Sequence, residues 1–285
     1  MSTHGRKQIL FDIGREAFQK LTGRTDVGYV CPICLGRFPN LQGLSEEHVP
    51  PAALGGKVLC LTCQECNSAA GHRIDTHIHR EQISQSFMEK TGQTRRATLI
   101  KNGHQLNVDV RHDNQGINIS ILGEHNNPRV VEILQPRDIL SGTSLQLRDR
   151  VSYSQTKADI GHLKSAYLAA FAKLGYAYIL RRELNSVRQQ IISPETQELG
   201  LLRLEARDGS NIQNDLFLFQ SPVRCLGIKM GNVIICLPVD SEGLYEKLQE
   251  MRSVGWKETW QIKERCDWPD RFELALDFSG RYRIE

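Results

Sequence analysis

The spacing of apolar and polar residues divides the first part of the chain into three stretches. Residues 11–21 alternate apolar and charged side chains at roughly helical spacing, and Gly23 ends this predicted helix. Residues 31–75 are rich in turn residues and cysteine, with one apolar run at residues 58–61 that predicts a strand. From Cys66 onward the pattern again predicts a helix. A turn-rich stretch of this kind buries little, so a structural metal is the usual stabiliser.

From about residue 97 the pattern becomes that of an antiparallel sheet. Residues 97–101 and 105–110 alternate on either side of Asn102-Gly103, the strongest short-range hairpin signal. Residues 117–122 repeat the pattern after a second turn, and residues 130–134 add a further predicted strand. We therefore expect a small antiparallel sheet here.

The last part of the chain mixes helices and strands. Residues 159–174 form the clearest predicted helix, with Gly175 expected at its C-cap. A second helix is predicted over residues 182–192, before Ser193-Pro194. The apolar stripe of the first helix consists of Ile160, Leu163, Tyr167, Ala170, Phe171 and Leu174. Further strands are expected at 201–205, 216–219, 224–230, 233–237 and 272–278, and a helix at 241–252.

These elements predict an α+β protein in two parts. The polar segment at residues 91–96 places the boundary near residue 95. We expect a first domain over residues 1–95, with its core at about 28–80, and a mixed α+β domain with an antiparallel sheet over residues 96–285. A sensing, DNA-holding or dimerising role is the hypothesis for the second domain.

Composition and charge narrow the class of protein. The 285 residues are 40% hydrophobic and 24% charged, as in a globular protein. No apolar run approaches the ~20 residues of a membrane span, and the first residues lack the apolar core of a signal peptide. We expect a cytoplasmic protein with no membrane partner, in which the eight cysteines serve as metal ligands before disulfides. The net charge of +3 arises within residues 1–100, which is compatible with nucleic acid but weak evidence for it.

Two cysteine pairs form the first chemical motif. Cys31 and Cys34 are spaced C-x2-C, as are Cys63 and Cys66, and two such turns provide the four thiolates that Zn²⁺ prefers. Cys60 lies three residues before Cys63, so a Cys60/Cys63 pairing stays open. We favour Cys63 and Cys66 because Cys60 lies in the apolar run that predicts a strand. A zinc site of this kind also occurs without catalysis, in zinc-dependent nucleic-acid-binding modules.

Between and beside the cysteine pairs lie residues of a second chemistry. Glu47 and the amide oxygen of Asn67 are hard ligands suited to Mg²⁺ or Mn²⁺. His48 directly follows Glu47, and an imidazole group can take a proton from water near neutral pH. Asn67 directly follows Cys66, so zinc would position it. His72, five residues beyond Asn67, is expected to be exposed or to contact phosphate, and the same applies to Asp75, His77 and His79.

Together these residues resemble the HNH endonucleases of the zinc-containing ββα-metal type. The resemblance covers roughly residues 28–80 and departs from the pattern in having Glu47 where Asp is common. It also lacks the middle Asn that braces the loop carrying the histidine, since residues 49–66 contain none. The matching motifs are Cys31-x2-Cys34, Glu47-His48-Val-Pro-Pro, Leu54-Gly-Gly56, Cys63-x2-Cys66-Asn67 and Gly71.

The resemblance implies a metal-dependent endonuclease that hydrolyses phosphodiester bonds of DNA by a one-metal mechanism. It assigns His48 as general base, Glu47 and Asn67 as ligands of catalytic Mg²⁺ or Mn²⁺, and the four cysteines as ligands of structural Zn²⁺. A bacterial restriction or phage-defence effector is the expected setting, with a homodimer or a regulatory partner protein as a further expectation. The alternatives are a non-catalytic zinc-dependent nucleic-acid-binding module and an RNase or toxin.

Overall fold

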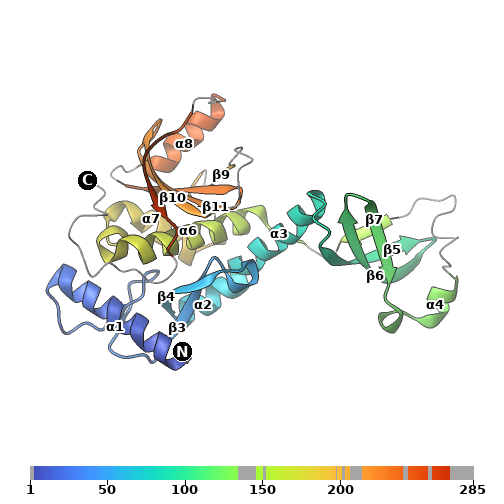
Figure 1. Cartoon of the computed structure of the whole chain (residues 1–285), viewed down its shortest axis with the longest axis horizontal. Helices are drawn as coiled ribbons and strands as arrows, with labels where there is room; N and C mark the ends of the chain where they lie inside the picture. The colour runs from blue at the N-terminus through green and yellow to red at the C-terminus, as the bar shows by residue number, and fades with distance from the viewer. Residues whose placement is uncertain are drawn as a thin grey trace. The chain divides into compact units, whose positions relative to one another are not determined.

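The chain folds into two compact units, shown in Figure 1 as a computed structural model. The first unit combines Met1–Thr76 with Gln155–Glu285, and the second is His77–Ser154. The predicted boundary near residue 95 falls inside the second unit, within its strand β5 (Thr94–Lys101). The structure describes residues 3–133, 146–149, 152–196, 198–200, 203–205, 214–239, 243–255 and 259–269.

The first unit begins with a helix and two short antiparallel hairpins, followed by a continuous helical run. Gly23 ends the first helix as predicted, with φ 72° and its N–H donating to Gln19 O over 2.8 Å, although the helix begins earlier than expected. The predicted strand at residues 58–61 is confirmed. In order, these elements are α1 (Thr3–Thr22), β1 (Tyr29–Val30), β2 (Arg37–Phe38), β3 (Leu44–Val49), η1 (Ala52–Leu54), β4 (Lys57–Cys63), α2 (Gln64–Ala70) and the π-helical turn η2 (Gly71–Asp75). The helical run continues into α3 (Thr76–Met88), which belongs to the second unit from His77 onward.

The remainder of the first unit is a five-stranded antiparallel sheet with helices. The sheet has the order β13-β10-β11-β12-β9. The edge strand β13 was not predicted, and the strand predicted at residues 272–278 lies outside the described residues. The elements are α6 (Gln155–Ile179), η4 (Arg182–Leu184), α7 (Asn185–Ile192), β9 (Arg203–Glu205), β10 (Asp215–Ser221), β11 (Cys225–Met230), β12 (Val233–Pro238), α8 (Leu244–Ser253) and β13 (Gln261–Asp267). Gly175, with φ 68°, interrupts α6 where the C-cap was predicted. Among the helices described, none has both the length and the apolar character to cross a membrane.

Helix α6 is the centre of the first unit. It contacts β3 and β4 on the cysteine-rich side and β11 and β12 of the five-stranded sheet (Figure 1). Two buried tyrosines of α6 donate hydrogen bonds to the cysteine-rich segment: Tyr167 Oη to Pro32 O over 2.7 Å and Tyr176 Oη to Val30 O over 2.6 Å. Buried apolar residues from both segments form one continuous hydrophobic core. The cysteine-rich segment therefore shares its core with residues far later in the chain.

The second unit contains a four-stranded antiparallel sheet in the order β7-β6-β5-β8. Its strands are β5 (Thr94–Lys101), β6 (His104–Asp113), β7 (Gly116–Ile121) and β8 (Gln146–Asp149). The predicted hairpin is confirmed, because Lys101 pairs with His104 and both turn residues have positive φ, Asn102 at 49° and Gly103 at 79°. A short 3-10 turn, η3 (Gly123–His125), follows β7.

The strand predicted at residues 130–134 is wrong for residues 130–133, because they belong to the helix α4 (Pro128–Ile133). Asn127 Oδ1 accepts the N–H of Arg129 over 3.1 Å, which is the geometry of an N-cap. Pro128 then occupies the first helical position, where its missing N–H has no cost. The local capping signal overrides the β-propensity of the two valines that follow.

Candidate functional site

Four cysteine sulfurs meet at the junction of the two hairpins and α2. Cys31 and Cys34 flank the turn between β1 and β2, while Cys63 ends β4 and Cys66 lies in the first turn of α2. Their Sγ atoms all lie within 4.8 Å of one another. Cys34 Sγ and Cys63 Sγ are 3.7 Å apart, close to the ~3.8 Å between two corners of a tetrahedron with Zn–S bonds of ~2.3 Å. The cluster fits a tetrahedral zinc ion.

Backbone N–H groups surround these sulfurs. The N–H of Cys63 points to Cys31 Sγ at 3.3 Å, and that of Cys66 points to Cys63 Sγ at 3.4 Å. Hydrogen bonding to Cys34 raises the pKa of Cys31, and the same interaction lowers the pKa of Cys34 to about 2. The donors around Cys34 and Cys63 lower the pKa of both thiols and so favour the thiolate form that binds a metal.

Cys60 lies outside this cluster. It is fully buried in β4, where it pairs with Glu47 across the hairpin. Burial raises the pKa of its thiol well above the ordinary value. The geometry therefore favours Cys63 and Cys66 over the alternative pairing through Cys60.

Glu47 and His48 are neighbours on β3 with different surroundings. The Glu47 residue is only 3% exposed, whereas His48 is half-buried. The register with β4 shifts between them, since Glu47 pairs with Cys60 but His48 pairs with Val58. A bulge of this kind redirects side chains and is common next to active sites. The His48 ring makes no hydrogen bond or ion pair with the residues that the structure describes, so it can interact with water or substrate.

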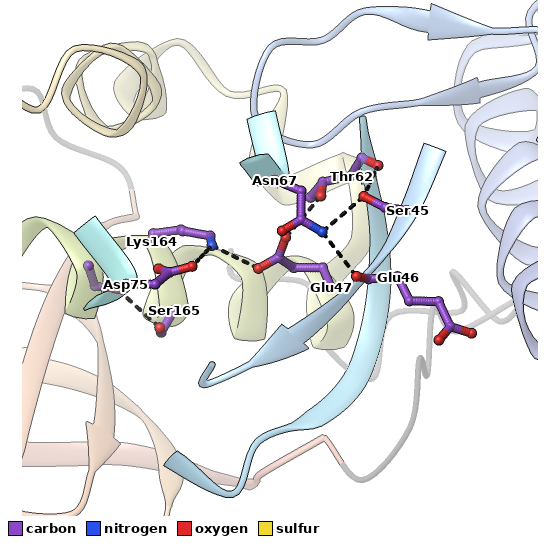
Figure 2. A network of polar contacts seen from close by, with 9 residues as sticks. Ser45, Glu46, Glu47, Thr62, Asn67, Asp75, Lys164 and Ser165 are labelled. Carbon is purple, nitrogen blue, oxygen red and sulfur yellow. Dashed lines mark hydrogen bonds and ion pairs between the residues drawn. The ribbon is translucent and has the colours of Figure 1, made fainter. Parts of the chain in front are cut away.

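Asn67 joins α2 to β3. Its Nδ2 donates to Ser45 Oγ over 2.9 Å and to the backbone Glu46 O over 3.1 Å (Figure 2). The second bond fixes the strand at the residue before Glu47-His48. Asn67 thus braces the strand that carries the histidine from the helix side.

The loop after His48 is held by its own backbone. Gly55 has φ 77°, and its N–H donates to Ala52 O over 3.0 Å. A Cβ at Gly56 would lie 1.5 Å from Pro50 O, so only glycine permits the two backbone segments to approach this closely. Together with the Asn67 hydrogen bonds, this turn supplies the bracing for which the sequence offers no middle asparagine.

Glu47 belongs to a buried network that reaches α6. Thr62 Oγ1 donates to Glu47 Oε2 over 2.9 Å, and Lys164 Nζ lies 2.8 Å from Glu47 Oε1. The same Nζ lies 2.8 Å from Asp75 Oδ2, at the end of η2 (Figure 2). Burial lowers the pKa of Lys164, but attraction to Glu47 and Asp75 outweighs it and the net pKa is raised. Lys164 is therefore an ammonium ion held between two carboxylates.

The second oxygen of Asp75 lacks a partner. Asp75 Oδ1 is buried and accepts no hydrogen bond from any described residue. A buried carboxylate oxygen without a donor is unusual, and a cation or water is the common explanation. Glu47, Asn67 and Asp75 together offer carboxylate and amide oxygens, which is the donor set of a hard divalent cation. The chemistry of these residues fits Mg²⁺ or Mn²⁺.

The sequence pattern did not single out Lys164, and it set Asp75 aside. A signal for Lys164 was present, because it lies on the predicted apolar stripe, four residues after Ile160 and three before Tyr167. A lysine at such a position is buried and needs anionic partners. The π-helical turn η2, which ends at Asp75, is a type of irregularity often found at functional sites, but it has no sequence signal here.

The remaining candidates lie apart from this network. His72 is exposed, and His77 Nδ1 accepts the N–H of Ser154 over 3.0 Å within the second unit. Two nearby arginines also have partners: Arg73 pairs with Glu195 at 3.1 Å, and Arg80 donates to Ser152 O over 3.1 Å. These residues have structural partners or lie on the surface.

Comparison with known proteins bears on the same segment. The model of the HNH endonuclease family matches residues 31–83. The search of curated proteins found no match, and neither did the search of solved structures. The matched segment begins at the first cysteine of the cluster, ends within α3, and contains Glu47, His48, Asn67 and Asp75. Residues 31–83 therefore match the HNH endonuclease family, as the motifs predicted.

Proposed function

We propose that this chain is a metal-dependent endonuclease that hydrolyses phosphodiester bonds of DNA, with His48 as general base. The observation that carries the proposal is the hydrogen bond from Asn67 to Glu46 O, which joins α2 to β3 at Glu47-His48. This contact links the backbone just before Glu47-His48 to the helix that carries Asn67, directly after Cys66 of the cysteine cluster.

The protein residues have separate tasks in this reaction. A ring nitrogen of His48 takes the proton from the attacking water, for which its half-buried position and lack of a described partner suit it. Asn67 Nδ2 keeps β3 in place through Ser45 and Glu46. Thr62 and Lys164 fix the orientation of the Glu47 carboxylate. One such site makes one nick, so cleavage of both strands would require two sites or two encounters.

Two metals are part of the proposal. Cys31, Cys34, Cys63 and Cys66 would hold Zn²⁺, which fixes the geometry of the hairpins and α2. Glu47 and Asn67 would hold Mg²⁺ or Mn²⁺, which would stabilise the charge that develops on the phosphate and leaving oxygen. Both oxygens of Glu47 already accept one interaction each, but each retains a lone pair.

The finer expectations rest on the family resemblance. A restriction or phage-defence setting, a cytoplasmic location, and a homodimer or regulatory partner stay predictions. So does a sensing, DNA-holding or dimerising role for residues 96–285. The choice of DNA over RNA belongs to the proposal and is tested with it.

The direct test incubates zinc-loaded protein with supercoiled plasmid and either Mg²⁺ or Mn²⁺. We expect nicking by the wild type and a loss of at least about a hundredfold in His48→Ala, since general-base catalysis contributes roughly that much. Equal nicking by both proteins, or by neither, would remove the assignment of His48.

The rival functions give different results in the same experiment. A non-catalytic zinc module would retard plasmid or single-stranded DNA in a gel without cutting it. An RNase or toxin would cleave labelled RNA at a higher kcat/KM than duplex DNA of the same sequence. Either result would replace the proposal.

A further inference from the structure

The ammonium of Lys164 occupies the space between two carboxylates of the candidate metal site. Its Nζ is 2.8 Å from Glu47 Oε1 and 2.8 Å from Asp75 Oδ2, and its side chain is 2% exposed. The lysine comes from α6, outside the segment that matches the HNH family. A lysine buried to this extent acts on whatever binds at Glu47.

We propose that Lys164 is a resident counter-cation that weakens the binding of a divalent metal at Glu47 and Asp75. The inference rests on the proposed function, because it takes Glu47 as a metal ligand. It adds Asp75 to the site as a second carboxylate, and it makes α6 a determinant of metal affinity.

The summed charge of the two carboxylates and the lysine gives the direction in which Lys164 changes metal affinity. Glu47, Asp75 and Lys164 together carry one net negative charge, so a bound divalent ion leaves the site with one net positive charge. Without Lys164 the two carboxylates would carry two negative charges and a divalent ion would neutralise them. Because the three groups are largely removed from water, their interaction with the ion is weakly screened. Lys164 therefore opposes the metal directly.

The unpaired oxygen of Asp75 supports its place in the site. Lys164 engages only Oδ2, and Oδ1 is buried without a described hydrogen-bond partner. If Asp75 served only to neutralise a structural lysine, its second buried oxygen would be expected to have a hydrogen-bond donor as well. The free oxygen is available to a ligand that the lysine does not replace.

The test measures Mn²⁺ binding by the electron paramagnetic resonance of free Mn²⁺, with the zinc content of each protein determined in parallel. Thiolate sites disfavour Mn²⁺, so the cysteine cluster does not obscure the result. Lys164→Met should bind Mn²⁺ at least about tenfold more tightly than the wild type, given the weak screening of buried charges. Lys164→Arg keeps the charge and should bind within a few-fold of the wild type.

A matched control and a charge-balanced pair complete the design. Lys157→Met removes another lysine of α6 that pairs with a carboxylate, Glu195 at 2.8 Å, and should leave Mn²⁺ affinity unchanged. Asp75→Asn removes a negative charge and should weaken binding. Adding Lys164→Met to Asp75→Asn restores the net charge and should restore affinity, so the comparison stands even if Lys164→Met alone does not fold.

The outcomes separate the inference from the proposed function. If Glu47→Gln abolishes Mn²⁺ binding but neither Lys164→Met nor the double variant binds more tightly than its parent, the inference is overturned while the metal site stands. If Glu47→Gln binds Mn²⁺ like the wild type, Glu47 is not a ligand and the proposed catalytic site fails. Affinity that rises with removal of Lys164 in both backgrounds supports the inference.

Discussion

At the residue scale, the candidate site contains two adjacent side chains with opposite surroundings. Glu47 is enclosed by Thr62 and Lys164, whereas the adjacent His48 makes no hydrogen bond to described residues. An enclosed carboxylate keeps one orientation, and an imidazole without a partner can accept a proton from water. The shift in register between these two residues separates their environments.

Asn67 serves as a brace as well as a candidate ligand, and Asn67→Asp separates the two roles. The aspartate keeps an oxygen for a metal but cannot donate to Ser45 Oγ and Glu46 O. We expect the free energy of unfolding to fall by about 1–3 kcal/mol, because the Glu46 carbonyl loses its donor and faces a negative charge. Urea unfolding of zinc-loaded protein measures this, and unchanged stability would show that the brace is unimportant.

Glu46 gives a dependence on pH. Arg6 of α1 donates to Glu46 Oε1 over 2.8 Å and to Oε2 over 2.5 Å, and these bonds lower the pKa of Glu46. A lowered folded-state pKa contributes stability that is present above the unfolded-state value and lost as pH falls through the folded-state value. Arg6→Met should therefore be less stable than the wild type at neutral pH, and the difference should vanish in acid. A constant difference down to about pH 3 would contradict this linkage.

At the scale of elements, the four cysteines that could hold zinc come from both hairpins and from α2. Cys66→Ser should release the zinc and with it the order of α2, because a segment this rich in turns buries too little to fold unaided. Cys60→Ser is the matched control and should retain the zinc, since Cys60 lies outside the cluster. Zinc content by mass spectrometry and helix content by circular dichroism measure both. Loss of zinc in Cys60→Ser alone would restore the alternative pairing.

The predicted elements match the observed ones where a strong local turn or cap signal is present. Asn102-Gly103 fixes a hairpin, Gly175 breaks a helix, and both are found where predicted. The prediction for residues 130–134 failed because Asn127 and Pro128 cap a helix that the valines do not favour. The edge strand β13 was missed because most of its residues are exposed and charged, so its pairing with β10 leaves no alternating pattern.

At the scale of the whole molecule, a helix from the second stretch of the first unit packs against the segment that matches the HNH family. Tyr167 and Tyr176 of α6 donate hydrogen bonds to Pro32 O and Val30 O, and Asp75 and Lys164 are 89 positions apart. The cysteines and Glu47-His48 could be predicted because they are close in the sequence. The partners of Glu47 and Asp75 could not, since spacing within one segment carries no information on what packs against it.

This arrangement predicts the behaviour of a fragment. Residues 1–95, which the sequence pattern sets apart as a domain, should not unfold cooperatively by themselves even with zinc. Without α6 the fragment would expose buried residues such as Tyr29, Leu44 and Leu61 and leave Glu47 without its cation. Thermal unfolding followed by circular dichroism tests this. A sharp cooperative transition in the zinc-loaded fragment would show that the segment folds independently.

The central claim is that His48 activates water for cleavage of a phosphodiester bond, and the rate of the first nick in supercoiled plasmid tests it most directly. Wild type, His48→Ala and His72→Ala are compared at equal zinc content, with Mn²⁺ as the added metal. His72 is an exposed histidine of the same segment and serves as the matched control. The account predicts a fall of at least about a hundredfold for His48→Ala and little change for His72→Ala. Equal rates for wild type and His48→Ala would contradict it.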